Sequence, residues 1–153
     1  MTDIEFENLF NKYKDMIYKI AFLYLKNEHD ALDIVQNTFI KMYHKKYFQD
    51  DEHIKRWLLR VCINLCKNHL KSYSRTHHQS YIDEYYGKND KNINLQELVF
   101  QLPPIYKSVT YLYYYEGYSV REIAKILRLS QATVKQRLKR ARKKLKIQWE
   151  EVQ

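Results

Sequence analysis

The chain of 153 residues is poor in the residues that interrupt or cross-link a fold, with only two glycines, two prolines and two cysteines. A turn-rich β fold needs many more glycines and prolines than this. Tyrosine, in contrast, occurs fifteen times, which favours long helices with amphipathic aromatic faces. The composition therefore predicts an all-α protein.

The sequence also lacks any apolar run long enough to span a bilayer. Met1 is followed by Asp3, Glu5 and Glu7, whereas a signal peptide begins with basic and then apolar residues. The basic segment 130–149 lacks the broad aromatic and aliphatic face of an interfacial membrane helix. We therefore expect a cytoplasmic protein with no direct membrane insertion.

Cys62 and Cys66 are four residues apart on a predicted helix, and His69 follows three residues later. A structural zinc site takes four ligands, and no fourth ligand is evident here. The simpler interpretation is a pair of small, reduced, half-buried side chains. We expect neither a metal nor another cofactor.

Positive charge is concentrated near the C-terminus. Residues 1–72 carry a formal charge of +2 and residues 73–101 a charge of −1, whereas residues 102–153 have twelve Lys and Arg against four Asp and Glu. A charge run alone is as often a solvated surface as a nucleic-acid site. The uneven distribution indicates a nearly neutral N-terminal domain joined to a small basic one.

The basic region has the pattern of a helix-turn-helix. Ser119 and Glu122 form a capping box for a short first helix, Arg128 lies in the turn, and Ser130 caps a second helix. Apolar residues at helical spacing mark the inward faces of both helices: Ile123, Ala124, Ile126, Leu127, Val134, Leu138, Ala141 and Leu145. The opposite face of the second helix would meet a major groove with Gln136, Lys139, Arg140 and Lys143.

Three helices are predicted in the N-terminal part. The first ends near residue 27, the second spans about 30–43 and the third about 54–72. Residues 44–53 lose the helical period and predict a loop. The second and third helices are expected to bury Ala31, Leu32, Val35, Phe39, Met42, Trp57, Leu58, Val61 and Leu65, with Cys62 as a further member. Polar residues then predict a flexible linker, followed by a helix from Leu95 to Leu102 and another from Pro104 to Gly117.

The outer side of the second helix is polar except at one position. Asp33, Gln36, Asn37 and Lys41 surround Ile40 on this side. An exposed isoleucine among polar groups suggests a contact surface, although isolated exposed apolar residues are also common. The helix alone leaves both interpretations open.

Three blocks resemble the extracytoplasmic-function class of bacterial sigma factors. They are DALDIVQNTFIKMY from Asp30, WLLRVCINLCKNHL from Trp57 and LPPIYKSVTYLYYYEGYSVREIAKILRLSQATVKQRLKRARKKL from Leu102. The resemblance covers nearly the whole chain and implies two helical domains, 1–72 and 95–153, joined by a linker at 73–94. It implies a non-enzymatic sigma factor that bridges core RNA polymerase and promoter DNA.

The resemblance also assigns roles to individual residues. The surface that docks on the clamp helices of the largest polymerase subunit would comprise Asp33, Gln36, Asn37 and Ile40. The residues that open and hold the −10 element would be Tyr47, Phe48, Arg60, Asn64 and Lys67. The residues at the −35 element would be Thr133, Lys135, Gln136, Arg137, Lys139, Arg140 and Lys143. The implied partners are core polymerase, through its clamp helices and flap, promoter DNA, and an anti-sigma factor.

Within these assignments, the role of the loop aromatics stays open and three residues depart from the family. Tyr47 and Phe48 can each offer a face for a base to stack on, but Phe48 can equally close the domain core. Leu32 and Asn37 stand where the family usually has acidic residues. Arg128 replaces the usual turn glycine, at a cost of about 1 kcal/mol if its backbone is left-handed.

Two other classes of function compete with the sigma interpretation. A stand-alone helix-turn-helix regulator would share the basic region but bind duplex DNA without core polymerase. An enzyme would need a nucleophile with its base, a phosphate-binding loop or a metal set, and the sequence contains none of these.

Overall fold

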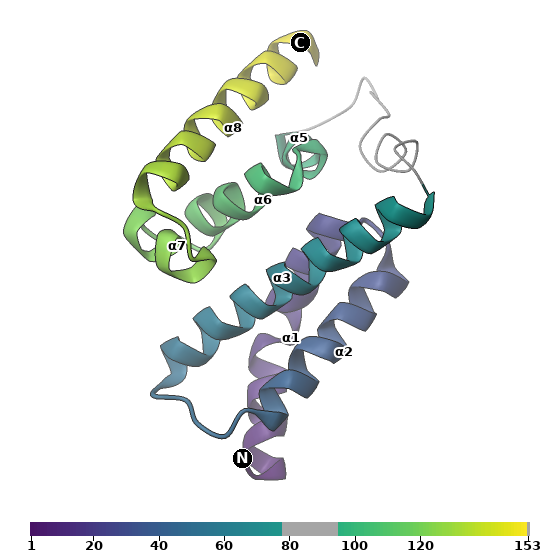
Figure 1. Ribbon diagram of the computed structural model, residues 1–153, viewed down its shortest axis with the longest axis vertical. Helices are drawn as coiled ribbons and strands as arrows, with labels where there is room; N and C mark the ends of the chain where they lie inside the picture. Colours follow the sequence, from purple (N-terminus) through teal and green to yellow (C-terminus); the bar gives the residue numbers. More distant parts are fainter. Residues whose placement is uncertain (78–94, 153) are drawn as a thin grey trace. The chain divides into compact units, whose positions relative to one another are not determined.

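The computed structural model describes residues 1–77 and 95–152. Every element in these ranges is a helix, which confirms the predicted all-α class. The chain divides into two compact units, Met1–Lys71 and Ser72–Gln153, and Figure 1 shows the helices of each. The elements are α1 (Asp3–Leu25), α2 (Glu28–His44), α3 (Asp51–His77), α5 (Leu95–Gln101), α6 (Pro104–Thr110), the π-helix η1 (Tyr111–Tyr115), α7 (Val120–Leu127) and α8 (Gln131–Val152).

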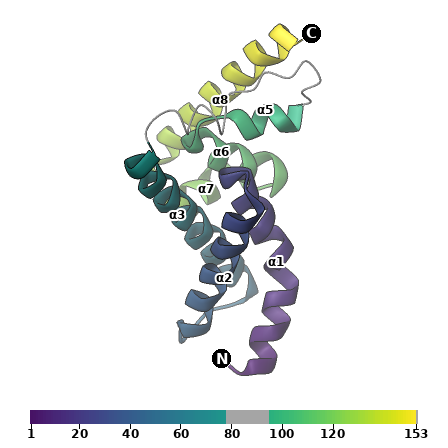
Figure 2. The same ribbon diagram turned by 90° about the vertical axis from the view of Figure 1, so that its right-hand side faces the viewer.

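In the N-terminal unit, α1, α2 and α3 lie side by side around an apolar core (Figures 1 and 2). Thr2 and Glu5 form a capping box that begins α1, and the Asn27 side chain caps α2 by accepting a hydrogen bond from the Asp30 N–H. Lys26 takes a left-handed conformation, with φ of 51°, which ends α1. The buried side chains include Ile17, Ile20, Ala21, Tyr24, Ala31, Phe39, Met42, Leu58, Leu59, Cys62, Ile63 and Cys66.

Helix α3 is longer than the sequence pattern predicts at both ends. The Asp50 carboxylate accepts a hydrogen bond from the His53 N–H at 2.7 Å, so the helix begins at Asp51 rather than near residue 54. The helix continues to His77, so residues 73–77 of the predicted linker are helical. The remaining residues of that linker, 78–94, lie outside the described ranges.

The predicted inward face of α3 was only partly right. Trp57, Val61 and Leu65 are only partly buried, whereas Leu59 and Ile63 are fully enclosed. The physical reason is that α3 packs against both neighbours, so its buried stripe is centred one residue further along the chain. A second error concerns α2, where Leu32 was expected in the core but is 50% exposed.

The C-terminal unit contains α5 to α8. The helix predicted from Pro104 to Gly117 is present as far as Tyr115, but its second half differs in type, because α6 ends at Thr110 and the π-helix η1 follows directly. In η1 the Glu116 N–H donates to the carbonyl of Tyr111, five residues earlier, at 3.2 Å. Gly117 then reverses the chain with φ of 72°. The core of this unit includes Leu98, Leu102, Val109, Leu112, Ile123, Ile126, Val134, Leu138 and Ala141.

Across residues 1–77 and 95–152, none of the helices combines the length and the apolar composition that a membrane span requires.

Candidate nucleic-acid and polymerase interfaces

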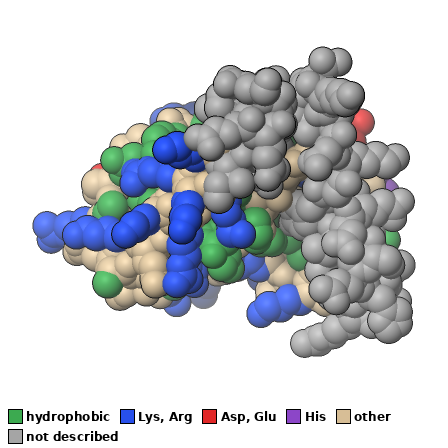
Figure 3. All heavy atoms as spheres, turned by 90° about the horizontal axis from the view of Figure 1, so that it is seen from above, with side chains coloured by type: hydrophobic (Ala, Val, Ile, Leu, Met, Phe, Trp, Pro, Cys, Tyr) green, Lys and Arg blue, Asp and Glu red, His purple; other side chains and the backbone are tan. Residues whose placement is uncertain are grey.

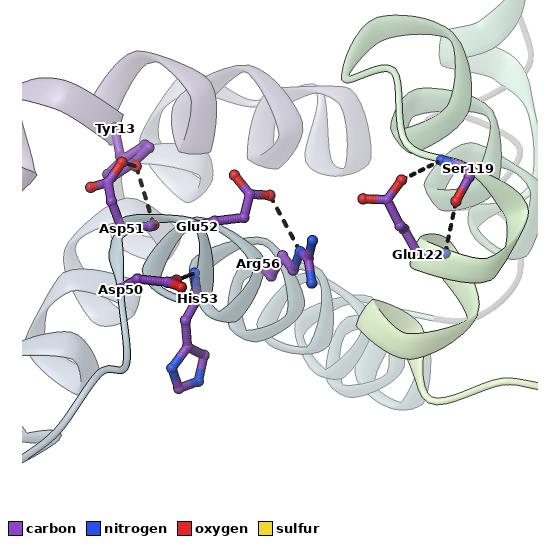
Figure 4. A network of polar contacts seen from close by, with 8 residues as sticks. All are labelled: Tyr13, Asp50, Asp51, Glu52, His53, Arg56, Ser119 and Glu122. Carbon is purple, nitrogen blue, oxygen red and sulfur yellow. Dashed lines mark hydrogen bonds and ion pairs between the residues drawn. The ribbon is translucent and has the colours of Figure 1, made fainter.

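Helices α7 and α8 are joined by a tight turn. Side-chain caps at the start of each helix and a left-handed residue at the end of α7 define this turn. The Ser119 hydroxyl accepts from the Glu122 N–H and the Glu122 carboxylate accepts from the Ser119 N–H, each at 3.1 Å, so the predicted capping box is present (Figure 4). Arg128 ends α7 in the left-handed region, with φ of 56° and ψ of 48°. The Ser130 hydroxyl then accepts from the Thr133 N–H at 3.1 Å and begins α8. The turn therefore has the conformation that a glycine would take most easily.

The two sides of α8 differ in burial and charge. Val134, Leu138 and Ala141 are enclosed against the rest of the unit. Thr133 and Arg137 lie at the edges of the opposite face and are half-buried. That face itself is exposed and presents Lys135, Gln136, Lys139, Arg140 and Lys143. In the view of Figure 3, blue Lys and Arg side chains gather on the surface, with hardly any red among them.

This arrangement is suited to bind duplex DNA. An exposed helix bearing Lys, Arg and Gln side chains can donate to guanine and pair with adenine in the major groove. The cations at its edges can contact phosphates, which carry affinity without sequence information.

On α2, the four residues predicted for polymerase binding share one exposed face. Asp33, Gln36 and Asn37 are exposed, and Ile40 is 46% exposed. Tyr43, at 45% exposure, lies at helical spacing on the same side. So does Leu32, which was wrongly predicted to be buried. The face is consequently more apolar than the sequence pattern predicts.

The loop between α2 and α3 treats its two aromatic residues differently. Tyr47 is 72% exposed. Phe48 packs edge-on against Trp57, with ring centroids 5.3 Å apart, and against His53 at 5.5 Å. The Lys45 ammonium lies 5.3 Å from the Phe48 ring centroid. Phe48 thus closes one side of the domain, and Tyr47 alone offers an open face.

A pocket of about 450 Å³ lies between this loop and the start of α1. It is lined by Met1, Glu5, Asn8, Leu9, Lys45, Lys46, Tyr47, Phe48 and Ile54. Asn64 is not among the lining residues. It lies on α3 with Arg60 and Lys67 at spacings of four and three residues, so these three side chains share one face of that helix.

Asp51 connects the C-terminal end of the loop to α1. Its carboxylate accepts hydrogen bonds from the Lys12 ammonium at 2.6 Å and from the Tyr13 hydroxyl at 2.7 Å (Figure 4 shows the Tyr13 side). These bonds lower the pKa of Asp51 below its usual range. Burial, with a further contribution from the Asp51 hydrogen bond, raises the pKa of Tyr13 well above its usual range. The C-terminal end of the loop is therefore held to α1 by hydrogen bonds and by charge.

The cysteines and the histidine do not form a ligand set. Cys62 and Cys66 are fully buried, and burial next to Cys66 raises the pKa of the Cys62 thiol well above its ordinary value. The Cys62 sulfur contacts the Ile17 carbonyl oxygen at 3.8 Å, and the His69 ring lies 3.5 Å from the Asp30 carboxylate. No cluster of three His, Cys, Asp or Glu side chains in residues 1–77 and 95–152 could hold a metal ion.

The sequence pattern missed the tyrosine pair Tyr113 and Tyr114, which lies against Arg142 of α8. The run of three tyrosines before Glu116 was the only signal for it, and three adjacent aromatic residues do not indicate which of them face the solvent.

The two helical units, one with a basic helix-turn-helix, together with the family models that match them, place the chain in the sigma class of transcription factors. A family model of sigma-70 region 2 matches residues 9–76, and a model of sigma-70 region 4 matches residues 93–145. The chain is 33% identical over 144 residues to the RNA polymerase sigma factor SigV of Bacillus subtilis, covering 89% of this chain and 86% of the relative. The chain belongs to the extracytoplasmic-function sigma factors.

A second relative and a solved structure are also similar to the chain, the latter in its fold. The extracytoplasmic-function sigma factor SigW of Bacillus subtilis is 27% identical, covering 94% of this chain and 88% of SigW. The fold matches that of the sigma factor RpoE from Bartonella quintana, solved in complex with the anti-sigma factor NepR, with a TM-score of 0.71 and 17% identity over 95% of this chain and 97% of that one.

Membership in the family settles the class of function. Sigma factors bind core RNA polymerase and promoter DNA, and this protein directs promoter-specific initiation of transcription. The two competing classes, a stand-alone regulator and an enzyme, are set aside because both regions of a sigma factor are present in the chain.

Proposed function

We propose that the two units divide promoter recognition between them. The N-terminal unit docks on core polymerase and opens the −10 element, and the exposed face of α8 reads the −35 element. The observation that carries the proposal is the separation of α8 into a buried apolar side and an exposed basic side, with Lys135, Gln136 and Lys139 on the latter. Such a surface matches the width and the donor and acceptor pattern of a major groove.

In the N-terminal unit, the α2 face of Asp33, Gln36, Asn37 and Ile40 would bind the clamp helices of the largest polymerase subunit. Its apolar members Ile40 and Leu32 supply area that loses water on docking, and the polar members set the register. The C-terminal unit would contact the polymerase flap.

At the −10 element, a base of the non-template strand would leave the stack and meet Tyr47, whose ring is the open aromatic face of the loop. Base stacking on an aromatic side chain contributes about 1–3 kcal/mol per base. Arg60, Asn64 and Lys67 would then hold the strand along one face of α3. Phe48 supports the loop from behind through its contact with Trp57.

An anti-sigma factor is a further expected partner, since the structural relative RpoE was solved bound to one. A protein with these partners works in the cytoplasm, where polymerase and promoter DNA are located.

Run-off transcription tests the division of labour. Core polymerase with this protein is expected to initiate specifically on the protein's own upstream DNA, whereas the protein alone binds that DNA weakly. Lys139→Ala should reduce discrimination at one −35 position by about 1–3 kcal/mol, or roughly 5- to 150-fold, while core binding stays unchanged. A variant that keeps wild-type −35 preference in a set of single-base promoter changes would contradict the assignment of α8.

A further inference from the structure

Two consecutive tyrosines of η1 hold the side chain of Arg142. The Arg142 Nε donates a hydrogen bond to the Tyr114 hydroxyl oxygen at 2.6 Å. The guanidinium carbon also lies 5.5 Å from the ring centroid of Tyr113 and 5.7 Å from that of Tyr114. The two rings are inclined at 76° with centroids 4.9 Å apart. We call Tyr113 and Tyr114 the tyrosine cradle.

The π-helix explains how neighbouring residues can share one cation. A π-helix has more residues per turn than an α-helix, so consecutive side chains point in less divergent directions. Tyr111 and Tyr115 also stabilise this turn, since their rings stack at 5.5 Å and the Tyr111 hydroxyl donates to the Glu116 carboxylate at 2.9 Å. Short π-helical segments frequently lie at functional sites.

Arg142 belongs to the same row of α8 as two of the proposed base-facing residues. Lys135, Lys139 and Arg142 are separated by four and three residues, so their side chains lie on one side of the helix, and all three are exposed. At a rise of 1.5 Å per residue, Arg142 lies about 10 Å further along the helix than Lys135. A major groove is about 12 Å wide. With Lys135 at the base edges, Arg142 would therefore reach the sugar–phosphate backbone that borders the groove.

Restraint of Arg142 has a chemical consequence. One of the five N–H donors of a guanidinium is used in the bond to Tyr114, while the exposed group keeps donors for an anion. An arginine that is already ordered loses less side-chain entropy when it binds. The bond to Tyr114 also raises the pKa of Arg142, and a guanidinium is charged in proteins in any case.

We infer that Tyr114 is a positioning residue for DNA binding, which orients Arg142 toward a backbone phosphate of the promoter duplex beside the −35 element. The inference rests on the proposed role of α8. It adds η1 to the DNA-binding surface and assigns to Tyr114 a role through its hydroxyl group rather than through packing alone.

The test measures binding of the holoenzyme, core polymerase with the full chain, to a promoter duplex across a range of salt concentrations. Arg142→Gln should reduce the slope of log K against log salt concentration by about 0.9, the value expected for one phosphate contact. Tyr114→Phe keeps the ring and removes the hydroxyl, and it should weaken binding about threefold to tenfold and also lower the slope. In the Arg142→Gln background, Tyr114→Phe should add no further loss.

Tyr115→Phe is the matched control, since it removes a hydroxyl from the adjacent exposed tyrosine and should leave affinity and slope unchanged. Wild-type affinity and slope for Tyr114→Phe, with weakened −35 preference for Lys139→Ala, would overturn the inference and leave the proposed function standing. Wild-type −35 preference for Lys139→Ala would instead contradict the proposed function. Weaker binding of Tyr114→Phe to core polymerase, with an unchanged salt slope on DNA, would assign the cradle to polymerase and overturn the inference.

Discussion

At the scale of single residues, Arg128 occupies a backbone conformation that side chains with a Cβ avoid. Its φ of 56° and ψ of 48° lie in the left-handed region, which costs about 1–2 kcal/mol for an L-residue other than glycine. The Arg128 and Leu129 N–H groups both donate to the carbonyl of Ala124, so the turn keeps the hydrogen bonds of a helix end. The helix-turn-helix is therefore built with the usual turn despite the unusual residue.

Arg128→Gly should stabilise the C-terminal unit by up to about 1 kcal/mol, because relief of the left-handed strain exceeds the extra chain entropy that glycine has in the unfolded state. Lys125→Gly is a matched control, since Lys125 is an exposed cation in the interior of α7 and glycine there should cost about 1 kcal/mol. Urea unfolding followed by circular dichroism would measure both. Equal losses of stability for the two variants would contradict the strain at Arg128.

The sequence predicted single residues well where a local hydrogen bond defines them. The capping box of Ser119 and Glu122 and the cap at Ser130 need only a short stretch of chain, and both are present. Burial of Leu32 was wrong, because burial depends on which side of α2 faces α1, and that direction is a property of the packed unit.

At the scale of elements, the loop between α2 and α3 shows how packing assigns different tasks to adjacent residues. Phe48 lies against Trp57 and beneath the Lys45 ammonium. Tyr47 next to it faces solvent at the rim of the pocket beside α1. The sequence offered both rings as stacking faces and left the choice open, since an aromatic pair in a loop has no period from which to read its directions.

Replacement of the two aromatic residues should have different effects on DNA opening and on stability. Tyr47→Ala is expected to leave stability nearly unchanged and to weaken opening of the −10 element about 5- to 150-fold, the loss of one stacked base. Phe48→Ala should lower the free energy of unfolding by about 1–3 kcal/mol, less than for a fully enclosed ring. Fluorescence of 2-aminopurine in the −10 element reports opening, and urea unfolding reports stability. Normal opening with Tyr47→Ala, and defective opening with a folded Phe48→Ala, would exchange the two roles.

Element boundaries were predictable where a local signal sets them and not where packing does. Pro104 at the start of α6 and the capping box of α7 are local signals. The π-helix η1 has no such signal, because its sequence fits an α-helix equally well. The inward side of α3 was displaced because its apolar residues are numerous enough to fit two neighbouring faces, and packing against both α1 and α2 selected one of them.

At the scale of the whole molecule, the two units differ in the chemistry of their surfaces. Residues 102–153 carry twelve Lys and Arg against four Asp and Glu, which suits a polyanion. The α2 face of the N-terminal unit combines Asp33, Gln36 and Asn37 with the apolar Ile40 and Leu32, which suits a protein partner. The uneven charge of the sequence predicted this contrast, because net charge needs no knowledge of packing.

A charge reversal on the α2 face should separate these partners. Asp33→Arg is expected to weaken binding to core polymerase at least tenfold and to reduce specific transcripts accordingly, because it places a cation on a surface that we propose docks on the clamp helices. The fold should remain intact, since Asp33 is exposed.

Asp15→Arg is the matched control: it makes the same change at an exposed position of α1, outside that face, and should bind core polymerase normally. Affinity for core polymerase, measured by fluorescence anisotropy with labelled protein, decides between them. Equal affinities for the two variants would remove the α2 face as the docking surface, whereas loss with Asp33→Arg alone would place the polymerase contact on α2 and leave the basic face of α8 for promoter DNA.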